Sequence, residues 1–253
     1  MDLKLHPNRM AIAAGSARTK QRLSVLGIGV MFRVRESDDL GSHGHFGGIP
    51  VCVCSLRGMA DEIAVAHHEA AHTVAALMTV NNKLDDRIAV TVGTIDGGPS
   101  GGNSKVRISG DHPVQAAFMY YAGPWAEARL QWGKPVHGLD DKDEGGTSFR
   151  RIVAEKFDFG ADSDGACYAA LIEAVPSIPD NEPYWSGQLE QAWPVVEKLA
   201  GALRDRLNGA EPRPYLPELG GNRTMRNGSM TYGEVVKLVK PLLETCGMWR
   251  YLS

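Results

Sequence analysis

The sequence predicts a mainly α-helical domain of the α+β class, with a small β-sheet beside its first long helix. Residues 59–78 contain neither glycine nor proline and are dominated by good helix formers. Shortly after them, Ile88, Val90 and Val92 alternate with other residues, as in a strand with one buried face. Helical spacing of apolar residues returns in several segments after residue 113. Because the chain has 253 residues, 43% of them hydrophobic, it can bury a sizeable core without disulfides.

The composition excludes several classes of partner. The formal net charge is -3, which offers no basic surface for nucleic acid or for an anionic membrane. The longest apolar stretch near the N-terminus, 24–32, is far shorter than the roughly 20 residues that span a bilayer, and it lacks a signal-peptide cleavage site. The four scattered cysteines do not suit a disulfide framework. We therefore expect a cytoplasmic protein with no nucleic-acid or membrane partner, and the sequence leaves its oligomeric state open.

Two regions are expected along the chain. Residues 1–58 are predicted to form an N-terminal arm with short strands at 22–35 and 49–55, packed on the main domain. Residues 59–253 are predicted to form that main domain, because they contain neither an internal repeat nor an interdomain linker.

The first part of the main domain combines helix and strand. The helix at 59–78 has acidic residues in its first turn, which suits the helix dipole. The strand at 87–95 leads into the glycine-rich run 97–104, which is predicted to be a loose loop. Residues 106–109 are predicted to be the hairpin partner of that strand.

Helices dominate the remainder. Pro113 is expected near the start of a helix that reaches residue 132 and that Gly123-Pro124 should kink or divide. After an acidic loop, apolar residues recur at helical spacing from 149 to 157. Further helices are predicted at 168–175, 185–207 and 232–244, with a surface loop at 209–228.

The first helix contains the sequence HEAAH at 68–72, which matches the pattern H-E-x-x-H. His68 and His72 lie one turn apart on the same face and can bind one zinc ion. Glu69 can reach a water on that metal without being a ligand, take its proton and pass it to a leaving amine. The alternative is a surface helix that carries these residues by chance. The surrounding segment, however, is apolar and rich in alanine, and polar side chains on a buried helix need partners.

Three segments resemble the protease domain of the FtsH family. They are AHHEAAHTVAAL around the motif, RIAVTV in the following strand and AGPWAEARLQWG in the next helix. The resemblance implies a helical, zincin-like metallopeptidase domain with a small β-sheet near the active-site helix. It also implies that two histidines and a more distant aspartate bind the zinc. Ala71, where the family usually has glycine, and Pro124 depart from the family pattern.

The resemblance assigns two more residues to the site. Glu127 matches a glutamate that supports the family's metal site, and it is thereby expected to hydrogen-bond a ligand histidine. A catalytic zinc usually has three protein ligands, so an aspartate of GLDDKDEGG is expected to complete the set, with Asp140, Asp141 and Asp143 as candidates. Asp141 is favoured because the apolar positions of the following helix then fall at FtsH-like spacing. The alternative is that all three aspartates only cap that helix.

The expected function is that of a zinc-dependent endopeptidase that hydrolyses exposed or unfolded polypeptide by Glu-assisted attack of water on zinc. The strand at 87–94 would be an edge to which the substrate adds as a further strand. No G-x-x-x-x-G-K-[ST] sequence occurs, so we expect an ATP-independent, stand-alone peptidase without the ATPase module. One alternative is a zinc-containing peptide-binding or regulatory protein without turnover. Another is a structural protein of a different fold with a chance HEAAH helix.

Overall fold

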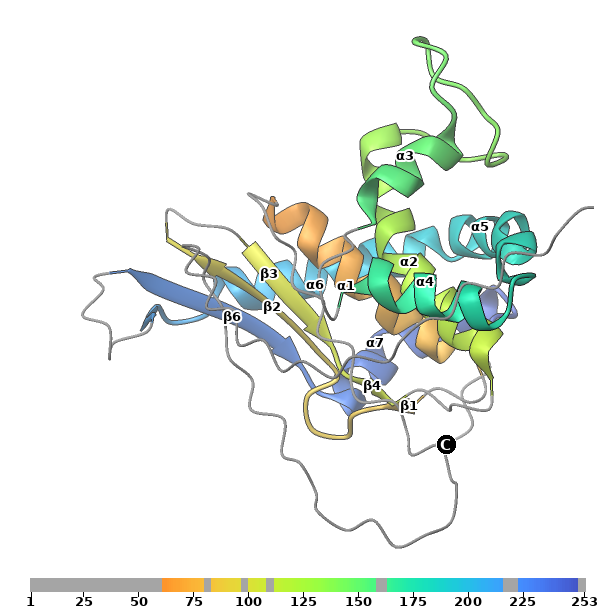
Figure 1. Ribbon diagram of the computed structural model, residues 1–253. Coiled ribbons are helices and arrows are strands. Elements are labelled where there is room, and N and C mark those ends of the chain that lie inside the picture. The colour runs from red at the N-terminus through yellow and green to blue at the C-terminus, as the bar shows by residue number, and fades with distance from the viewer. Residues whose placement is uncertain are drawn as a thin grey trace, which may run out of the picture. The chain divides into compact units, whose positions relative to one another are not determined.

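The computed structural model describes residues 61–79, 83–96, 100–107, 112–157, 163–215 and 223–249, and it combines helices with antiparallel strands (Figure 1). The described residues all belong to one compact unit. The mixed helix and sheet content agrees with the predicted α+β class. The arm at 1–58 and its two strands lie outside the described residues.

Helices make up most of the described chain. In order, they are α1 (Glu62–Leu77), α2 (Pro113–Trp132), α3 (Phe149–Lys156), α4 (Asp164–Ala174), the short 3-10 helix η1 (Ile178–Asn181), α5 (Glu182–Gln191), α6 (Trp193–Asn208) and α7 (Tyr232–Thr245). The strands are β1 (Lys83–Leu84), β2 (Val90–Ile95), β3 (Ser100–Ser104), β4 (Val106–Arg107), β5 (Arg213–Pro214) and β6 (Thr224–Met230). None of the described helices is long and apolar enough to cross a membrane.

Helix α1 confirms the helix predicted at 59–78 and lies at the centre of the packing. Its first turn is capped by Asp61, whose carboxylate accepts a hydrogen bond from the backbone N–H of Ile63 at 3.1 Å. Every residue from Val65 to Leu77 is buried. The helix packs against strands β2 and β3 and against α2 and α6 (Figure 1). Its alanines allow these neighbours to approach closely, and the HEAAH motif is consequently inside the protein.

Helix α2 confirms the helix predicted from Pro113 to residue 132, but Gly123-Pro124 does not divide it. Helical structure continues through both residues to Trp132. The helix ends at Gly133, which adopts a left-handed conformation with φ of 71° and donates its N–H to the Arg129 carbonyl. A single helix therefore runs alongside α1.

A four-stranded antiparallel sheet has the order β3-β2-β6-β5. Strand β2 confirms the strand predicted at 87–95 and buries Val90 and Val92, whereas Ile88 precedes it and is exposed. Because β2 pairs with β3 on one side and β6 on the other, it is not the sheet edge expected from the sequence. The edge beside α1 is β3.

Three predictions for the strands and loops are corrected. Residues 97–104 are not simply a loose loop, because Ser100–Ser104 forms β3. Residues 106–109 are not the hairpin partner of β2, because Val106–Arg107 pairs with β1. The surface loop predicted at 209–228 contains β5 and much of β6, and β6 lies inside the sheet.

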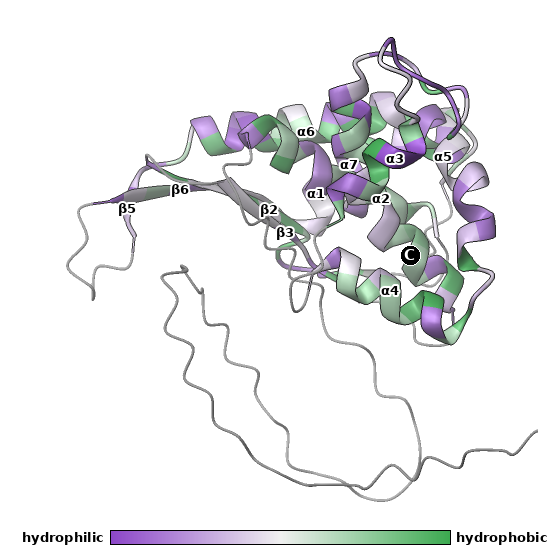
Figure 2. Cartoon of the chain, turned by 45° about the horizontal axis from the view of Figure 1, so that its top comes forward, coloured by the Kyte–Doolittle hydropathy of each residue, from purple (hydrophilic) through white to green (hydrophobic). Residues whose placement is uncertain are grey.

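The C-terminal helices largely follow the apolar pattern. Helix α7 confirms the helix predicted at 232–244, while the segment 185–207 is divided between α5 and α6 at Ala192. Figure 2 shows hydrophobic and hydrophilic residues alternating along α6, as expected for a helix with one buried face. Helix α4 begins at Asp164, four residues before the predicted helix at 168–175.

Candidate metal centre

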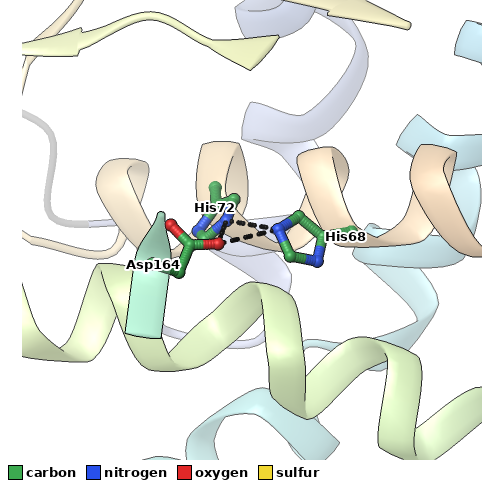
Figure 3. Close-up of side chains that lie close together, drawn as sticks. All are labelled: His68, His72 and Asp164. Carbon is green, nitrogen blue, oxygen red and sulfur yellow. Dashed lines mark hydrogen bonds and ion pairs between the residues drawn. The ribbon is translucent and has the colours of Figure 1, made fainter. Parts of the chain in front are cut away.

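Two histidines of α1 and one aspartate of α4 bring three donor atoms together (Figure 3). The Nε2 atoms of His68 and His72 are 2.9 Å apart. The Asp164 Oδ2 atom is 2.9 Å from the first and 3.0 Å from the second. All three residues are at least 95% buried. This group could hold a metal ion.

The other ring nitrogen of each histidine fixes which nitrogen carries the proton. The Nδ1 atom of His68 lies 2.6 Å from the Glu127 carboxylate, and that of His72 lies 2.7 Å from the Met119 carbonyl. Both partners are acceptors, so each Nδ1 carries the proton and donates. Each Nε2 of a neutral ring then presents a lone pair to the other and to Asp164. Three lone pairs at this separation repel one another unless a cation or an additional proton lies among them.

The separations suit a metal ion after a small adjustment. Donor atoms about 2.0–2.1 Å from a tetrahedral zinc ion are about 3.3 Å apart, a few tenths of an ångström more than the separations observed here. The interactions at Nδ1 hold both rings in orientation while leaving Nε2 directed at the site. The residues present therefore fit a metal bound by two imidazoles and one carboxylate.

Asp164 is the first residue of α4, and the local sequence explains why it is there. The side chain of Ser163 caps the helix by accepting from the Ala166 N–H. Burial raises the pKa of Asp164, but when the imidazoles of His72 and His68 carry the additional proton at Nε2, their charge and hydrogen bonds outweigh burial and hold that pKa well below the ordinary value. The carboxylate is therefore ionised and available to a cation.

Gly123 of α2 keeps the space around the donor atoms open. A Cβ atom at this position would lie 2.4 Å from Nε2 of His72 and 2.6 Å from Nε2 of His68. Both separations are shorter than the 3.0 Å limit for real Cβ contacts. Any larger residue at this point of α2 would therefore displace the imidazoles.

The side chain of Glu69 extends from α1 toward the edge strand β3. Its side chain is fully buried, and the Ser104 hydroxyl lies 2.7 Å from its Oε2 atom, to which it can donate. A Cβ atom at Gly102 would lie 2.3 Å from Cγ of Glu69, so only glycine lets β3 cross this closely. The close contact between β3 and the Glu69 side chain thus depends on glycine at position 102.

The two expected histidines of the first helix thus meet at one site, Glu69 is buried beside β3, and Glu127 makes the expected hydrogen bond to His68. The burial of His68, Glu69 and His72 contradicts the alternative of a surface helix that carries them by chance.

Asp141 is not the aspartate that joins the histidines, so the prediction of the third donor is corrected. Its Oδ2 atom accepts from the backbone N–H groups of His137 and Gly138, at 2.9 and 3.0 Å, and closes a local turn. That turn belongs to the loop before α3, whereas the donor beside the histidines comes from the start of α4.

The other two candidates in the acidic loop also make local contacts. Asp140 pairs with Arg150 at 3.3 Å, and Asp143 accepts from the Thr147 N–H at 2.8 Å. The alternative that these aspartates cap α3 is not seen either, because Ser148 is its N-cap.

Sequence reasoning missed Asp164, Gly123 and Ser104. A signal for the first was present, because a serine followed by an aspartate before an apolar helical pattern is a typical helix start. A signal for the second was a glycine inside a helical pattern, which often has a packing reason. Nothing local in the sequence marks Ser104 as a partner of Glu69.

Comparison of the chain with protein-family models, with curated proteins and with solved structures gave no match.

Proposed function

We propose that this chain is a zinc-dependent endopeptidase that hydrolyses exposed or unfolded polypeptide. The observation that carries the proposal is the convergence of His68 Nε2, His72 Nε2 and Asp164 Oδ2 at 2.9–3.0 Å. In helix α1, the residue that follows His68 is Glu69. Two imidazoles and one carboxylate are a common protein donor set of catalytic zinc sites, which keep a further position open. The zincin-like fold and the likeness to the FtsH protease domain are part of this proposal.

Each residue around the site would have one task. A bound zinc ion would polarise the scissile carbonyl and lower the pKa of the attacking water. The Glu69 carboxylate would take a proton from that water and pass it to the amide nitrogen as the peptide bond breaks. The hydroxyl of Ser104 would hold Oε2 of Glu69 in place, and Glu127 would keep the His68 ring oriented through Nδ1.

Strand β3 is the favoured place for substrate. It is one of the two edge strands of the four-stranded sheet, the other being β5, and it passes directly over Glu69 at Gly102. An extended peptide that added beside β3 would bind through its main chain, and its scissile bond could be brought to the glutamate. Two glycines at the centre of β3, Gly101 and Gly102, leave the main chain of this edge accessible. Binding of this kind favours unfolded over compact substrates.

The test combines metal analysis with peptide hydrolysis. The purified chain should bind about one zinc per molecule and cleave a casein-type unfolded substrate, but not a stable folded protein, with the same rate with and without ATP. A chelator should stop the cleavage, and added zinc should restore it. Glu69→Gln should abolish cleavage with nearly unchanged zinc content, because the amide has the same size but cannot accept the proton. Zinc binding without any cleavage by the unaltered chain would instead support a peptide-binding or regulatory protein, and undiminished turnover in the variant would remove the mechanism.

A further inference from the structure

The groups that would carry out the proposed reaction are enclosed by the protein. Glu69 is 0% exposed, and His68 and His72 are 2% and 1% exposed. A general base acts only on a proton within about 2.6–3.2 Å or one water away, so the bond to be cleaved must come close to Glu69. A polypeptide cannot come that close while these side chains are enclosed. Part of the enclosure therefore has to move before a substrate reaches the site.

Strand β3 lies over Glu69. A Cβ atom at Gly102 would lie 2.7 Å from Oε1 of Glu69, so the main chain of the strand covers the carboxylate directly. The Ser104 hydroxyl lies 2.7 Å from Oε2 and 2.8 Å from the main-chain carbonyl oxygen of Glu69. It also lies 3.2 Å from the hydroxyl of Thr73, which donates to the same carbonyl. Ser104 thus fastens one end of β3 to α1, beside the glutamate.

Strand β3 is weakly anchored compared with the helices that carry the donor atoms. Among the described strands it pairs with β2 alone, and its sequence, SGGNS, has no apolar side chain to bury. Glycines inside a strand weaken it, because they lose more conformational freedom on folding and have no side chain to pack. Helix α1, by contrast, is buried continuously from Val65 to Leu77. Local opening starts where few buried contacts are lost, and at this site that element is β3.

The pairing with β2 shows which bonds such an opening would break. The N–H of Lys105, directly after β3, donates to the carbonyl of Ala89 at 2.8 Å. Successive residues of a strand direct their main-chain groups to opposite edges, so Gly101 and Asn103 also direct theirs at β2. The amides of these two residues therefore report whether β3 is paired.

We propose that β3 is a gate over the catalytic glutamate. The structure describes its closed state, and a polypeptide reaches Glu69 only after β3 has moved away. Two serine hydroxyls hold the gate closed: Ser104 contacts Glu69, and Ser100 donates to the hydroxyl of Thr94 in β2 at 3.3 Å. The open fraction then limits turnover, as with other loops and strands that close an active site. The effect on turnover rests on the proposed peptidase activity, whereas the opening itself does not.

Hydrogen exchange of the full chain tests the opening without metal or turnover. After correction for intrinsic rates, the amides of Gly101 and Asn103 should exchange at least about tenfold faster than those of β6, on the other side of β2. Thr94→Val removes the hydroxyl that accepts from Ser100 and should speed exchange in β3 about two- to tenfold, the value of one hydrogen bond. Equal protection of β3 and β6 would overturn the proposal.

A disulfide tests whether opening is needed for cleavage. Thr91 of β2 lies opposite both Asn103 of β3 and Ser229 of β6, and residues directly opposite each other are close enough for a disulfide. Thr91→Cys with Asn103→Cys pins the gate. Once oxidised, this variant should cleave a casein-type substrate at least about tenfold more slowly at unchanged zinc content, and reduction should restore the rate. Thr91→Cys with Ser229→Cys is the matched control and should keep the rate of the parent chain in both states.

The loosened variant gives the opposite sign. Thr94→Val should cleave about two- to tenfold faster than the parent chain, because it raises the open fraction, whereas damage to the fold would slow cleavage. Mass spectrometry identifies the engineered bond, since the chain has four cysteines of its own. Undiminished cleavage by the pinned variant, or an equal loss in its control, would overturn the gate. A parent chain that cleaves nothing would count against the peptidase proposal, and hydrogen exchange would then decide the opening by itself.

Discussion

Replacing Gly123 with alanine should abolish tight metal binding without damaging the fold. The added Cβ would lie 2.4 Å from Nε2 of His72 and 2.6 Å from Nε2 of His68, and normal contacts start at 3.0 Å. The two nitrogens would have to retreat by about 0.6 and 0.4 Å, while metal–ligand distances tolerate only about 0.2 Å. Neither ring can yield easily, because each is held through its Nδ1 atom. We therefore expect zinc affinity to fall by more than about 100-fold, or about 2.8 kcal/mol.

The matched control for this variant is Gly187→Ala in α5. A Cβ at that position meets nothing within 4 Å, so the substitution makes the same chemical change away from the site. Both variants should keep the circular dichroism of the parent, since alanine is a better helix former than glycine. Zinc affinity is measured by competition with a chromophoric chelator. An unchanged affinity in the Gly123 variant would refute the inference that the donor atoms beside this glycine hold the metal.

Four other substitutions test the remaining parts of the argument. Asp164→Ala should weaken zinc binding about 100-fold or more, because it removes a donor atom. Asp141→Ala, which removes none, should weaken zinc binding by less than about threefold. Equal losses of affinity in the two variants would contradict the assignment of Asp164. Glu127→Gln should weaken zinc binding about 10- to 100-fold through the orientation of His68, as seen for other residues that hold ligands, and an unchanged affinity would argue against this role. Glu234→Ala should lower the free energy of unfolding by about 0.5–1 kcal/mol near pH 7, because it removes the capping box of α7. Hydrogen bonds from the Thr231 backbone and then the Arg206 side chain lower the pKa of Glu234. This contribution should therefore be present above the carboxyl's ordinary pKa and disappear as the pH falls through the folded value. Urea unfolding near pH 7 and pH 3 measures it, and a difference that does not change with pH would contradict the reasoning.

Local patterns made the helices predictable. The period of the apolar residues and the absence of glycine and proline determine where α1 lies, and the spacing of His68 and His72 places both on one face without any knowledge of the tertiary structure. The strands β3 and β6 were missed for the opposite reason. Their sequences, SGGNS and TMRNGSM, lack the alternation of apolar residues that marks a half-buried strand. They become strands because β2 offers a partner on each side.

The helix start at Asp164 was recognisable in the sequence, but its role as the third donor was not, for a different reason. Asp164 is 92 residues from His72 along the chain, and no local rule states which of several helix starts packs beside α1. Asp141 precedes an apolar helical pattern just as Asp164 does, so the two positions look alike in sequence. Both α3 and α4 pack against α2, which carries Gly123, but only the start of α4 brings an aspartate to the two histidines.

The hydrogen bonds at the two Nδ1 atoms bear on how the protein acquires its metal. Protein groups hold both rings in orientation through Nδ1, and the two Nε2 atoms lie 2.9 Å apart. In a zinc finger, by contrast, the metal organises the chain and its removal unfolds the domain. Here α1 is enclosed by the sheet and by α2 and α6, so its amide protons should exchange with solvent only when the whole unit opens. Loading and stripping of the metal would then be reversible events in a chain that stays folded, and the rate of loading would be governed by access to the site rather than by refolding.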